Sequence, residues 1–502
     1  MKSTIFIEST KGNLYLYDFL KKEIIPCHPL IQVFDLLDRK NLLDDLYRII
    51  DGENSDMADK YKREDIDYYL NKYLNYKKCG YFSFFKKREA LEYDELVIKE
   101  SLCNINNIVF EVTDACNLNC AYCTYGNMYY DYDYDPRKNQ MMGFDTVKTV
   151  FDFFIPLWNS HSNKSSSKIT TVGFYGGEPL LNFELIEKSV LFCNRLNLSN
   201  RIFKYTMTTN ATLIDRHISF LVKNDFHITI SLDGSKQNQS YRVFHNGKNS
   251  FDRVFRNIKL IREKYPDFFE TNVSFNSVLH NRNSVEEIHK FIFNEFGKVP
   301  QISSVNNYGI KPEMINEFKS MFILYHDSLG GNDSQLISER FTNDPNVFRL
   351  CQFLLWYSSS QFFDYESFLY VKDQLPRAIN GTCVPFSRKM FITVNKKIMV
   401  CERVDFKYSW GIVDDGKVNL DLDYIADKYN RYYKKMFKQC HDCYMINGCH
   451  QCIFQLENLD STPHCYGYKS EKQMIDYIKT YIDMLENRNI PFEELFNDVV
   501  FS

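Results

Sequence analysis

Hydrophobic positions between residues 105 and 305 switch repeatedly between two spacings. Six short runs are apolar and β-branched in the way of buried strands: NIVFEVT, KITTVGFY, FKYTMTT, FHITISL, NVSFNSVL and QISSVNN. The segments between them carry an apolar stripe at helical spacing, as in DTVKTVFDFFIPLW and VEEIHKFIFNEF. Alternation of this length predicts an α/β fold of parallel strands joined by right-handed crossover helices. In such folds the chemistry gathers in the loops after the carboxyl ends of the strands.

The first 100 residues follow a different pattern. Two alternating segments, TIFIEST and NLYLYDF, flank Lys11-Gly12-Asn13, which is a hairpin signal. Helical spacing follows in LIQVFDLLDRKNLLDDLYRII and REDIDYYLNKYLNYKKCGYF. We expect a small strand-and-helix module here. Towards the other end, residues 306–382 are predicted to be a helical connection, and SEKQMIDYIKTYIDMLENR predicts a closing helix.

Composition narrows the class of protein. The chain has 502 residues, which is enough for two to four domains, and a net charge of −4, so no overall basic field favours nucleic acid. The start, MKSTIFIEST, lacks the features of a signal peptide, and no apolar run approaches membrane-spanning length. We expect a soluble cytoplasmic protein with no nucleic-acid or membrane partner.

The fifteen cysteines are clustered. Without a secretory signal a disulfide framework is not expected, and clustered thiols indicate metal binding or catalysis. Three cysteines lie close together in DACNLNCAYC and seven lie between residues 383 and 465. The other five are expected to be buried small hydrophobic residues: Cys27, Cys79, Cys103, Cys193 and Cys351.

The first group has the spacing C-x3-C-x2-C and follows the first strand of the predicted sheet. Its members are Cys116, Cys120 and Cys123. Four thiolates are the usual complete set of protein ligands for structural zinc or for an ordinary [4Fe-4S] cube. Three would leave one iron of a cube open for a ligand. A zinc site with its fourth ligand elsewhere in the chain is the alternative on spacing alone.

CNLNCAYC resembles the cluster loop of the radical S-adenosylmethionine (radical SAM) enzymes, in which an aromatic residue usually precedes the third cysteine, as Tyr122 does here. The resemblance continues in order through YGGEP, TTNATL, SLDG and YRVFHNGKNSFDRVFRNI, and covers residues 108 to about 300. It implies a partial (β/α)6 barrel and a [4Fe-4S] cluster that binds S-adenosylmethionine. Without the resemblance, such stretches have ordinary structural explanations, namely a turn, a helix cap or the end of a strand.

The resemblance also implies which residues contact S-adenosylmethionine. Glu178 would receive the methionine ammonium and Arg242 its carboxylate, which suits a zwitterionic amino acid, and glycines would let the backbone approach closely. The full set carried over is Tyr122, Gly176, Gly177, Glu178, Pro179, Thr209, Asn210, Ser231, Asp233 and Arg242.

The second cysteine group resembles a SPASM extension, which carries auxiliary iron-sulfur clusters. Paired C-x2-C elements alone are typical of zinc, but seven cysteines do not divide into two four-ligand zinc sites. The resemblance implies two auxiliary [4Fe-4S] clusters, one on Cys440, Cys443, Cys449 and Cys465 and one on Cys383, Cys401 and Cys452.

This second group departs from the family pattern. The gap before Cys452 is two residues, where three are more usual, and Lys396 stands where a glycine is expected. No fourth ligand is evident just upstream of Cys383, so the cluster there is expected to have an open iron. Glu402, directly after Cys401, would be the base that accepts a proton near the substrate, or else an exposed turn carboxylate.

The chain thus resembles the radical SAM enzymes that mature ribosomally made peptides, and the resemblance implies a peptide maturase that forms an intrapeptide thioether or carbon-carbon crosslink in such a precursor. Its partners would be that precursor with its leader and an electron donor such as flavodoxin or ferredoxin. The alternatives are an anaerobic sulfatase-maturating enzyme that makes formylglycine and, more remotely, a zinc-stapled interaction protein. The expected domains are a winged-helix-like leader-recognition module (1–100), the barrel (101–305), the helical connection (306–382), the SPASM domain (383–470) and a closing helix and tail (471–502).

Overall fold

The computed structural model describes most of the chain. The described residues are 2–51, 60–84, 92–130, 139–164, 169–196, 198, 201–307, 309–323, 328, 350, 353–354, 357–358, 381–446, 449, 451–456 and 458–487. Cys351 and most of the predicted helical connection, like the tail from residue 488, lie outside these residues. Among the helices in these ranges, none combines the length and the hydrophobicity that crossing a bilayer requires.

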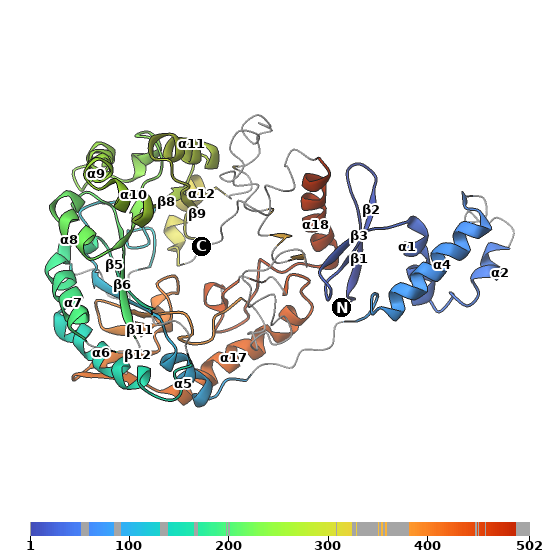
Figure 1. The fold of residues 1–502 in the computed structure, drawn as a ribbon, viewed down its shortest axis with the longest axis horizontal. Helices are drawn as coiled ribbons and strands as arrows, with labels where there is room; N and C mark the ends of the chain where they lie inside the picture. The colour runs from blue at the N-terminus through green and yellow to red at the C-terminus, as the bar shows by residue number, and fades with distance from the viewer. Residues whose placement is uncertain are drawn as a thin grey trace.

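A parallel sheet of six strands forms the centre, in the order β4-β5-β6-β7-β8-β9. All six strands correspond to the predicted runs, which confirms the α/β class and the partial (β/α)6 barrel. Helices cover one face of the curved sheet (Figure 1). The strands are Asn107–Thr113, Ile169–Gly176, Ile202–Thr209, His227–Ser231, Val273–Leu279 and Gln301–Ser304. The helices α6 to α12 are Phe144–Trp158, Phe183–Arg195, Ile218–Lys223, Phe251–Lys264, Pro266–Asn272, Val285–Phe296 and Ile315–Met321.

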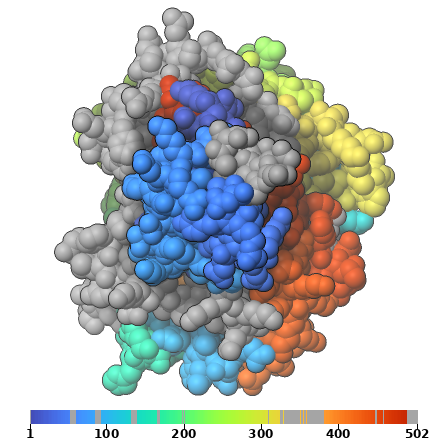
Figure 2. Space-filling model, turned by 90° about the vertical axis from the view of Figure 1, so that its right-hand side faces the viewer, coloured from blue at the N-terminus to red at the C-terminus, as the bar shows by residue number. Residues whose placement is uncertain are grey.

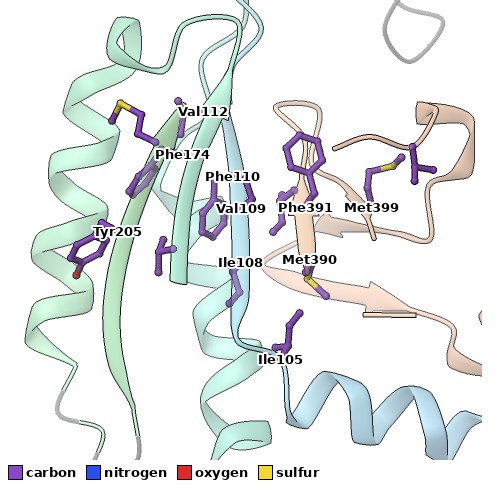
Figure 3. Packing of buried hydrophobic residues seen from close by; sticks show 14 of the residues in the cluster. Ile105, Ile108, Val109, Phe110, Val112, Phe174, Tyr205, Met390, Phe391 and Met399 are labelled. Carbon is purple, nitrogen blue, oxygen red and sulfur yellow. The ribbon is translucent and has the colours of Figure 1, made fainter. Parts of the chain in front are cut away.

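The cysteine-rich region extends the same sheet beyond β4. Strand β10 (Met390–Ile392) runs parallel to β4, with Met390 opposite Ile108, and β11 (Lys397–Met399), β12 (Gly411–Asp414) and β13 (Lys417–Leu420) follow antiparallel. Side chains from both parts share one core, in which Phe391 lies near Val109 (Figure 3). Helices α5 (Glu95–Cys103) and α17 (Leu422–His441) pack together at this end. The sequence did not predict this pairing, which brings the two cysteine groups onto one sheet.

The N-terminal module has a three-stranded antiparallel sheet and, among its described residues, the helices α1, α2 and α4. Strands β1 (Thr4–Glu8) and β2 (Leu14–Asp18) form the predicted hairpin, in which Gly12 has φ +79°. A third strand, β3 (Glu23–Pro26), was not predicted. The long helical pattern divides into α1 (Pro29–Arg39) and α2 (Leu46–Ile50), and α4 spans Arg63–Lys78. These helices lie on the far side of the three-stranded sheet from the barrel (Figure 1), and they face the viewer in Figure 2.

The closing helix α18 (Glu471–Glu486) attaches this module to the rest of the chain. Ile5 and Ile7 of β1 pack against Met474 and Ile478 of α18. At the end of the helix, the Tyr15 hydroxyl donates to Glu486 at 2.6 Å. The module is therefore held against the cysteine-rich end of the molecule and does not stand free.

The five isolated cysteines only partly follow the prediction. Cys103 and Cys193 are buried as expected, and Cys27 is half-buried. The prediction is wrong for Cys79, which is exposed because it caps the carboxyl end of α4. A position at a helix end on the surface offers no core for its side chain to join.

Candidate functional site

The three-cysteine loop leaves the carboxyl end of β4. A hairpin that follows β7 supports the loop: Asn119 N–H donates to the Val243 carbonyl at 2.7 Å and Ala121 N–H to the Tyr241 carbonyl at 3.2 Å. Burial raises the pKa of the Cys120 thiol to about 12; the nearby Arg242 lowers it, whereas Cys123 and Cys116 raise it further. The three thiols therefore repel one another as thiolates, and a bound iron-sulfur cluster would remove that cost by neutralising them.

The sulfur atoms do not form a site for a single ion. Within the described ranges, no three His, Cys, Asp or Glu side chains converge closely enough to hold one metal ion. Zinc needs its ligands at about 2.0–2.3 Å. In a [4Fe-4S] cube each thiolate binds a different iron, so the ligands stand farther apart. Three cysteines on one loop can each bind a different iron of such a cube.

The glycine pair after β5 packs against the backbone that leads into Cys116. Gly177 N–H donates to the Thr113 carbonyl at 2.9 Å, and Glu178 N–H donates to the Ala115 carbonyl at 2.8 Å. A Cβ on Gly176, which has φ +143°, would overlap the Thr113 carbonyl oxygen, and one on Gly177 would overlap that of Ala115. The close approach that these glycines allow is thus to the base of the cluster loop.

Glu178 is buried and its carboxylate is already occupied by hydrogen bonds. It accepts from the Thr209 hydroxyl at 2.6 Å, from Asn210 N–H at 2.8 Å and from Leu180 N–H at 3.1 Å. Burial raises its pKa to about 7, although these three donors favour the ionised form. Glu178 therefore links the end of β5 to the end of β6. The expected contact with an ammonium group stays a prediction.

Two neighbours of Glu178 complete this edge of the sheet. Pro179 begins a short 3-10 helix, Pro179–Asn182, and is buried. Asn210 points its Nδ2 at the cluster loop, 2.9 Å from the Asn117 Oδ1 and 3.8 Å from the Cys116 sulfur. The structure thus brings Asn210 into contact with the loop, and its expected contact with S-adenosylmethionine stays a prediction.

Arg242 lies in a buried ionic cluster beside the same loop. Its Nε–H donates to Asp233 at 3.0 Å, its guanidinium lies over the Tyr122 ring, and the Tyr122 hydroxyl also donates to Asp233. Burial opposes ionisation of Asp233, but Arg242 and His280 outweigh it and hold the pKa at about 2. Among the described residues Arg242 hydrogen-bonds only through Nε, so its terminal amino groups are available for an anion.

Ser231 and Asp233 flank the end of β7 and are both buried. With Thr209 at the end of β6 and Tyr122 in the loop after β4, the predicted cosubstrate residues all come from one edge of the sheet. His280 was missed by the sequence analysis. It is fully buried and stacks on Tyr122, and its position just after β8 is the signal that would have found it.

Four of the seven later cysteines line one cavity. Cys440, Cys443, Cys449 and Cys465 line it together with apolar side chains that include Met436. The four residues predicted to hold one auxiliary cluster are therefore brought together.

The other three later cysteines lie near Tyr429. Burial first, and then the charges of Cys452, Cys383 and Cys401, hold the pKa of this tyrosine well above its ordinary value. Cys383 is exposed, whereas Cys401 and Cys452 are half-buried. Upstream of Cys383, where a fourth ligand would be expected, residues 359–380 lie outside the described residues.

Glu402 is paired with a lysine that the sequence analysis missed. The Lys389 ammonium donates to both carboxylate oxygens, at 2.8 and 2.9 Å. Burial opposes ionisation of Glu402, but Lys389 outweighs it and lowers the pKa of the carboxyl. The alternative of an exposed turn carboxylate is wrong, because only 17% of the side chain is exposed.

Tyr175, directly before the glycine pair, connects the two halves of the site. It is half-buried in the fold, and burial raises the pKa of its hydroxyl, as do the charges of Glu402 and then of Cys123. The pKa of this one side chain is thus influenced both by the first cysteine group and by the carboxylate next to Cys401. Its place at the carboxyl end of β5 was the available signal.

Comparison with known proteins agrees with this arrangement. The radical SAM superfamily matches residues 110–293. A cysteine-type anaerobic sulfatase-maturating enzyme of Clostridium novyi is 26% identical over 259 residues, which are 48% of this chain and 64% of that enzyme. The radical SAM cyclopropyl synthase TigE of Paramaledivibacter caminithermalis is 23% identical over 257 residues, covering 49% of this chain and 50% of TigE.

A solved structure described as native anSMEcpe with bound AdoMet and Kp18Cys peptide superimposes with a TM-score of 0.51 at 17% identity. It covers 76% of this chain and 98% of its own. That similarity shows a shared fold. The chain spans between half and two thirds of the length of the two curated relatives above.

Proposed function

Since residues 110–293 form a domain of the radical SAM superfamily, we propose that the protein is a peptide maturase. It uses S-adenosylmethionine to form an intrapeptide thioether or carbon-carbon crosslink in a ribosomally made precursor. The single observation that carries this proposal is the pairing of β10 with β4. This pairing puts the segment that carries Cys401 and Glu402 on the same sheet as β4, which leads into the loop of Cys116, Cys120 and Cys123, and so supports one shared site.

Cys116, Cys120 and Cys123 would hold a [4Fe-4S] cluster with one open iron. When bound, such a cluster would supply the one-electron reduction that splits S-adenosylmethionine into methionine and a deoxyadenosyl radical, and auxiliary clusters would supply an acceptor for the electron released on product formation. Arg242, fixed by Asp233, would bind the methionine carboxylate. Tyr122 and the packed glycine pair would hold the loop in position.

Glu402 would accept a proton from the reacting residue of the bound peptide. Lys389 keeps its carboxylate ionised and in one orientation, and Tyr175 lies near both this carboxylate and Cys123. Cys383, Cys401 and Cys452 would hold the auxiliary cluster next to it, and Cys440, Cys443, Cys449 and Cys465 the more distant one. This assigns residues 383–470 to a SPASM domain.

The N-terminal module would capture the leader segment of the precursor. Within the described ranges, strand β3 pairs with β2 on one side only. Its other edge presents unpaired backbone donors and acceptors, and an extended peptide binds such an edge by adding a strand. The attachment of the module to α18 fixes its position relative to the cysteine-rich region.

The test is anaerobic incubation with reductant, S-adenosylmethionine and a short peptide encoded beside the gene, followed by mass spectrometry. We expect a product that has lost two hydrogen atoms, formed only when the leader is attached. A peptide unchanged under conditions in which S-adenosylmethionine is cleaved would contradict the proposal.

A second candidate is formylglycine formation on a sulfatase. The similarity to the sulfatase-maturating enzyme of Clostridium novyi favours it. The N-terminal module argues against it, because a sulfatase-maturating enzyme would need no leader-binding sheet. A sulfatase-derived peptide offered in the same assay separates the two, since an aldehyde in that peptide would support the second candidate.

We expect Glu402→Gln to lower peptide product by about 10²-fold or more, because a positioned general base contributes at least that much. Cleavage of S-adenosylmethionine without peptide product would continue, since Glu402 does not contact the first cysteine loop. Both quantities are measured by liquid chromatography. Glu184→Gln, on the exposed face of α7, is the matched control. Equal product from both variants would remove Glu402 from the reaction.

A further inference from the structure

An open pocket lies directly beside the three-cysteine loop, and nothing in the proposed reaction uses it. Four parts of the chain form it: the loop itself, the turn after β6, the hairpin that leads into α9, and α9. We call it the arginine pocket. It is lined by Asn117, Thr212, Leu213, Arg216, Phe244, Asp252, Arg253 and Arg256.

The lining carries unneutralised positive charge. Arg253 is satisfied, because it donates to Asp215 at 3.0 and 3.1 Å. Asp252 is paired with Lys236 at 2.6 Å. Arg216 and Arg256 are exposed, and neither forms an ion pair with any described residue. A local positive surface in a chain of net charge −4 attracts a negatively charged partner.

The wall of this pocket is in direct contact with the first cysteine. Asn117 follows Cys116 in the chain, and its Nδ2 donates to the Thr212 hydroxyl at 2.8 Å. Asn210 joins Asn117 to the Cys116 sulfur, and the Cys116 carbonyl lies 2.9 Å from the exposed His245 ring. A molecule seated in the pocket is therefore separated from Cys116 by a single layer of side chains.

We propose that the arginine pocket is the docking surface for an acidic one-electron carrier protein of the flavodoxin or ferredoxin class. This inference rests on the proposed function. In each encounter the carrier is oxidised by one electron, and that electron reduces the cluster held by Cys116, Cys120 and Cys123. No bond forms between the two proteins.

The geometry favours a protein surface over a small buried anion. Arg216 and Arg256 stand exposed at an open pocket and do not enclose a ligand, and exposed charges mainly speed and orient protein encounters. Helix α9, which supplies Asp252, Arg253 and Arg256, lies on the opposite side of the molecule from the N-terminal sheet (Figure 1). The carrier and a precursor leader therefore bind without competing for space.

The test compares two electron sources on the full-length protein with its clusters. The variant is Arg216→Glu/Arg256→Glu, and the control with the same charge change is Arg195→Glu/Arg431→Glu, on α7 and α17. Deoxyadenosine formation is driven either by reduced flavodoxin or by dithionite. Binding of oxidised flavodoxin is measured at low and high salt.

We expect the variant to raise the KM for flavodoxin by about tenfold or more and to abolish the salt dependence of binding. Its rate with dithionite and the behaviour of the control stay at the parent values. Unchanged flavodoxin binding and KM in the variant would overturn the docking assignment. So would inorganic phosphate binding that the variant loses while its flavodoxin binding stays intact, because the pocket would then be a small-anion site.

Failure of the proposed function has a different signature. A parent protein that forms no deoxyadenosine even with dithionite contradicts the radical reaction, whereas the binding measurement still decides where flavodoxin docks. An equal loss with dithionite and with flavodoxin in the variant would mean that the substitutions damage the cysteine loop, and it would also overturn the assignment.

Discussion

Replacement of Cys116, Cys120 and Cys123 with alanine should abolish cleavage of S-adenosylmethionine, lowering deoxyadenosine formation by at least about 10³-fold. The three thiolates act as one unit, because a cube held by fewer ligands is not retained beside the loop. Deoxyadenosine is measured by chromatography after anaerobic reduction with dithionite, which bypasses any carrier protein.

The same triple variant should remain folded. The three cysteines are half-buried, and the apolar core of the barrel is built from other side chains. We expect the circular dichroism spectrum of the parent. Cys79→Ala, at an exposed helix end, is the control and should retain full activity. Deoxyadenosine from the triple variant at the parent rate would place the reactive cluster elsewhere.

Gly177→Ala should have the second largest effect, on both stability and iron content. The added Cβ would lie 2.6 Å from the Ala115 carbonyl carbon and 2.8 Å from the Asp114 oxygen. These are backbone atoms, which cannot turn aside as a flexible side chain would. We expect the free energy of unfolding to fall by about 1–3 kcal/mol or more, because the cluster loop must shift.

Gly143→Ala is the matched control for that substitution. A Cβ at Gly143 meets nothing within 4 Å, and its φ of −88° suits any residue. Thermal unfolding and iron content after anaerobic reconstitution are measured for both variants. Gly177→Ala with the melting temperature and iron content of the parent would show that the packing of the glycine pair on the loop is unimportant.

The barrel could be predicted from sequence because each of its strands is a long enough apolar run between amphipathic helices. NIVFEVT and KITTVGFY, for example, became β4 and β5 with bounds shifted by at most one residue. The strands of the cysteine-rich region could not be predicted, because β10 and β11 have only three residues each. Their pairing with β4 depends on the tertiary fold, and no periodicity in so short a segment reveals it.

The candidate site was also predictable only where it depends on local sequence. Positions at strand ends, such as Thr209 and Ser231, follow from the order of motifs along the chain. Contacts between residues that are distant in sequence could not be predicted in this way. Examples are the ion pair of Lys389 with Glu402 and the stacking of His280 on Tyr122, which form only in the folded chain. The hydrogen bonds that Glu178 accepts could likewise not be predicted from the sequence, since their donors lie at the end of a neighbouring strand.

Iron, sulfide and zinc content of the anaerobically purified protein tests the central claim most directly. The account predicts about twelve irons with matching sulfide, and about eight in the variant that lacks Cys116, Cys120 and Cys123. Zinc in place of iron in both proteins would contradict the radical reaction and leave the cysteine groups as structural zinc sites.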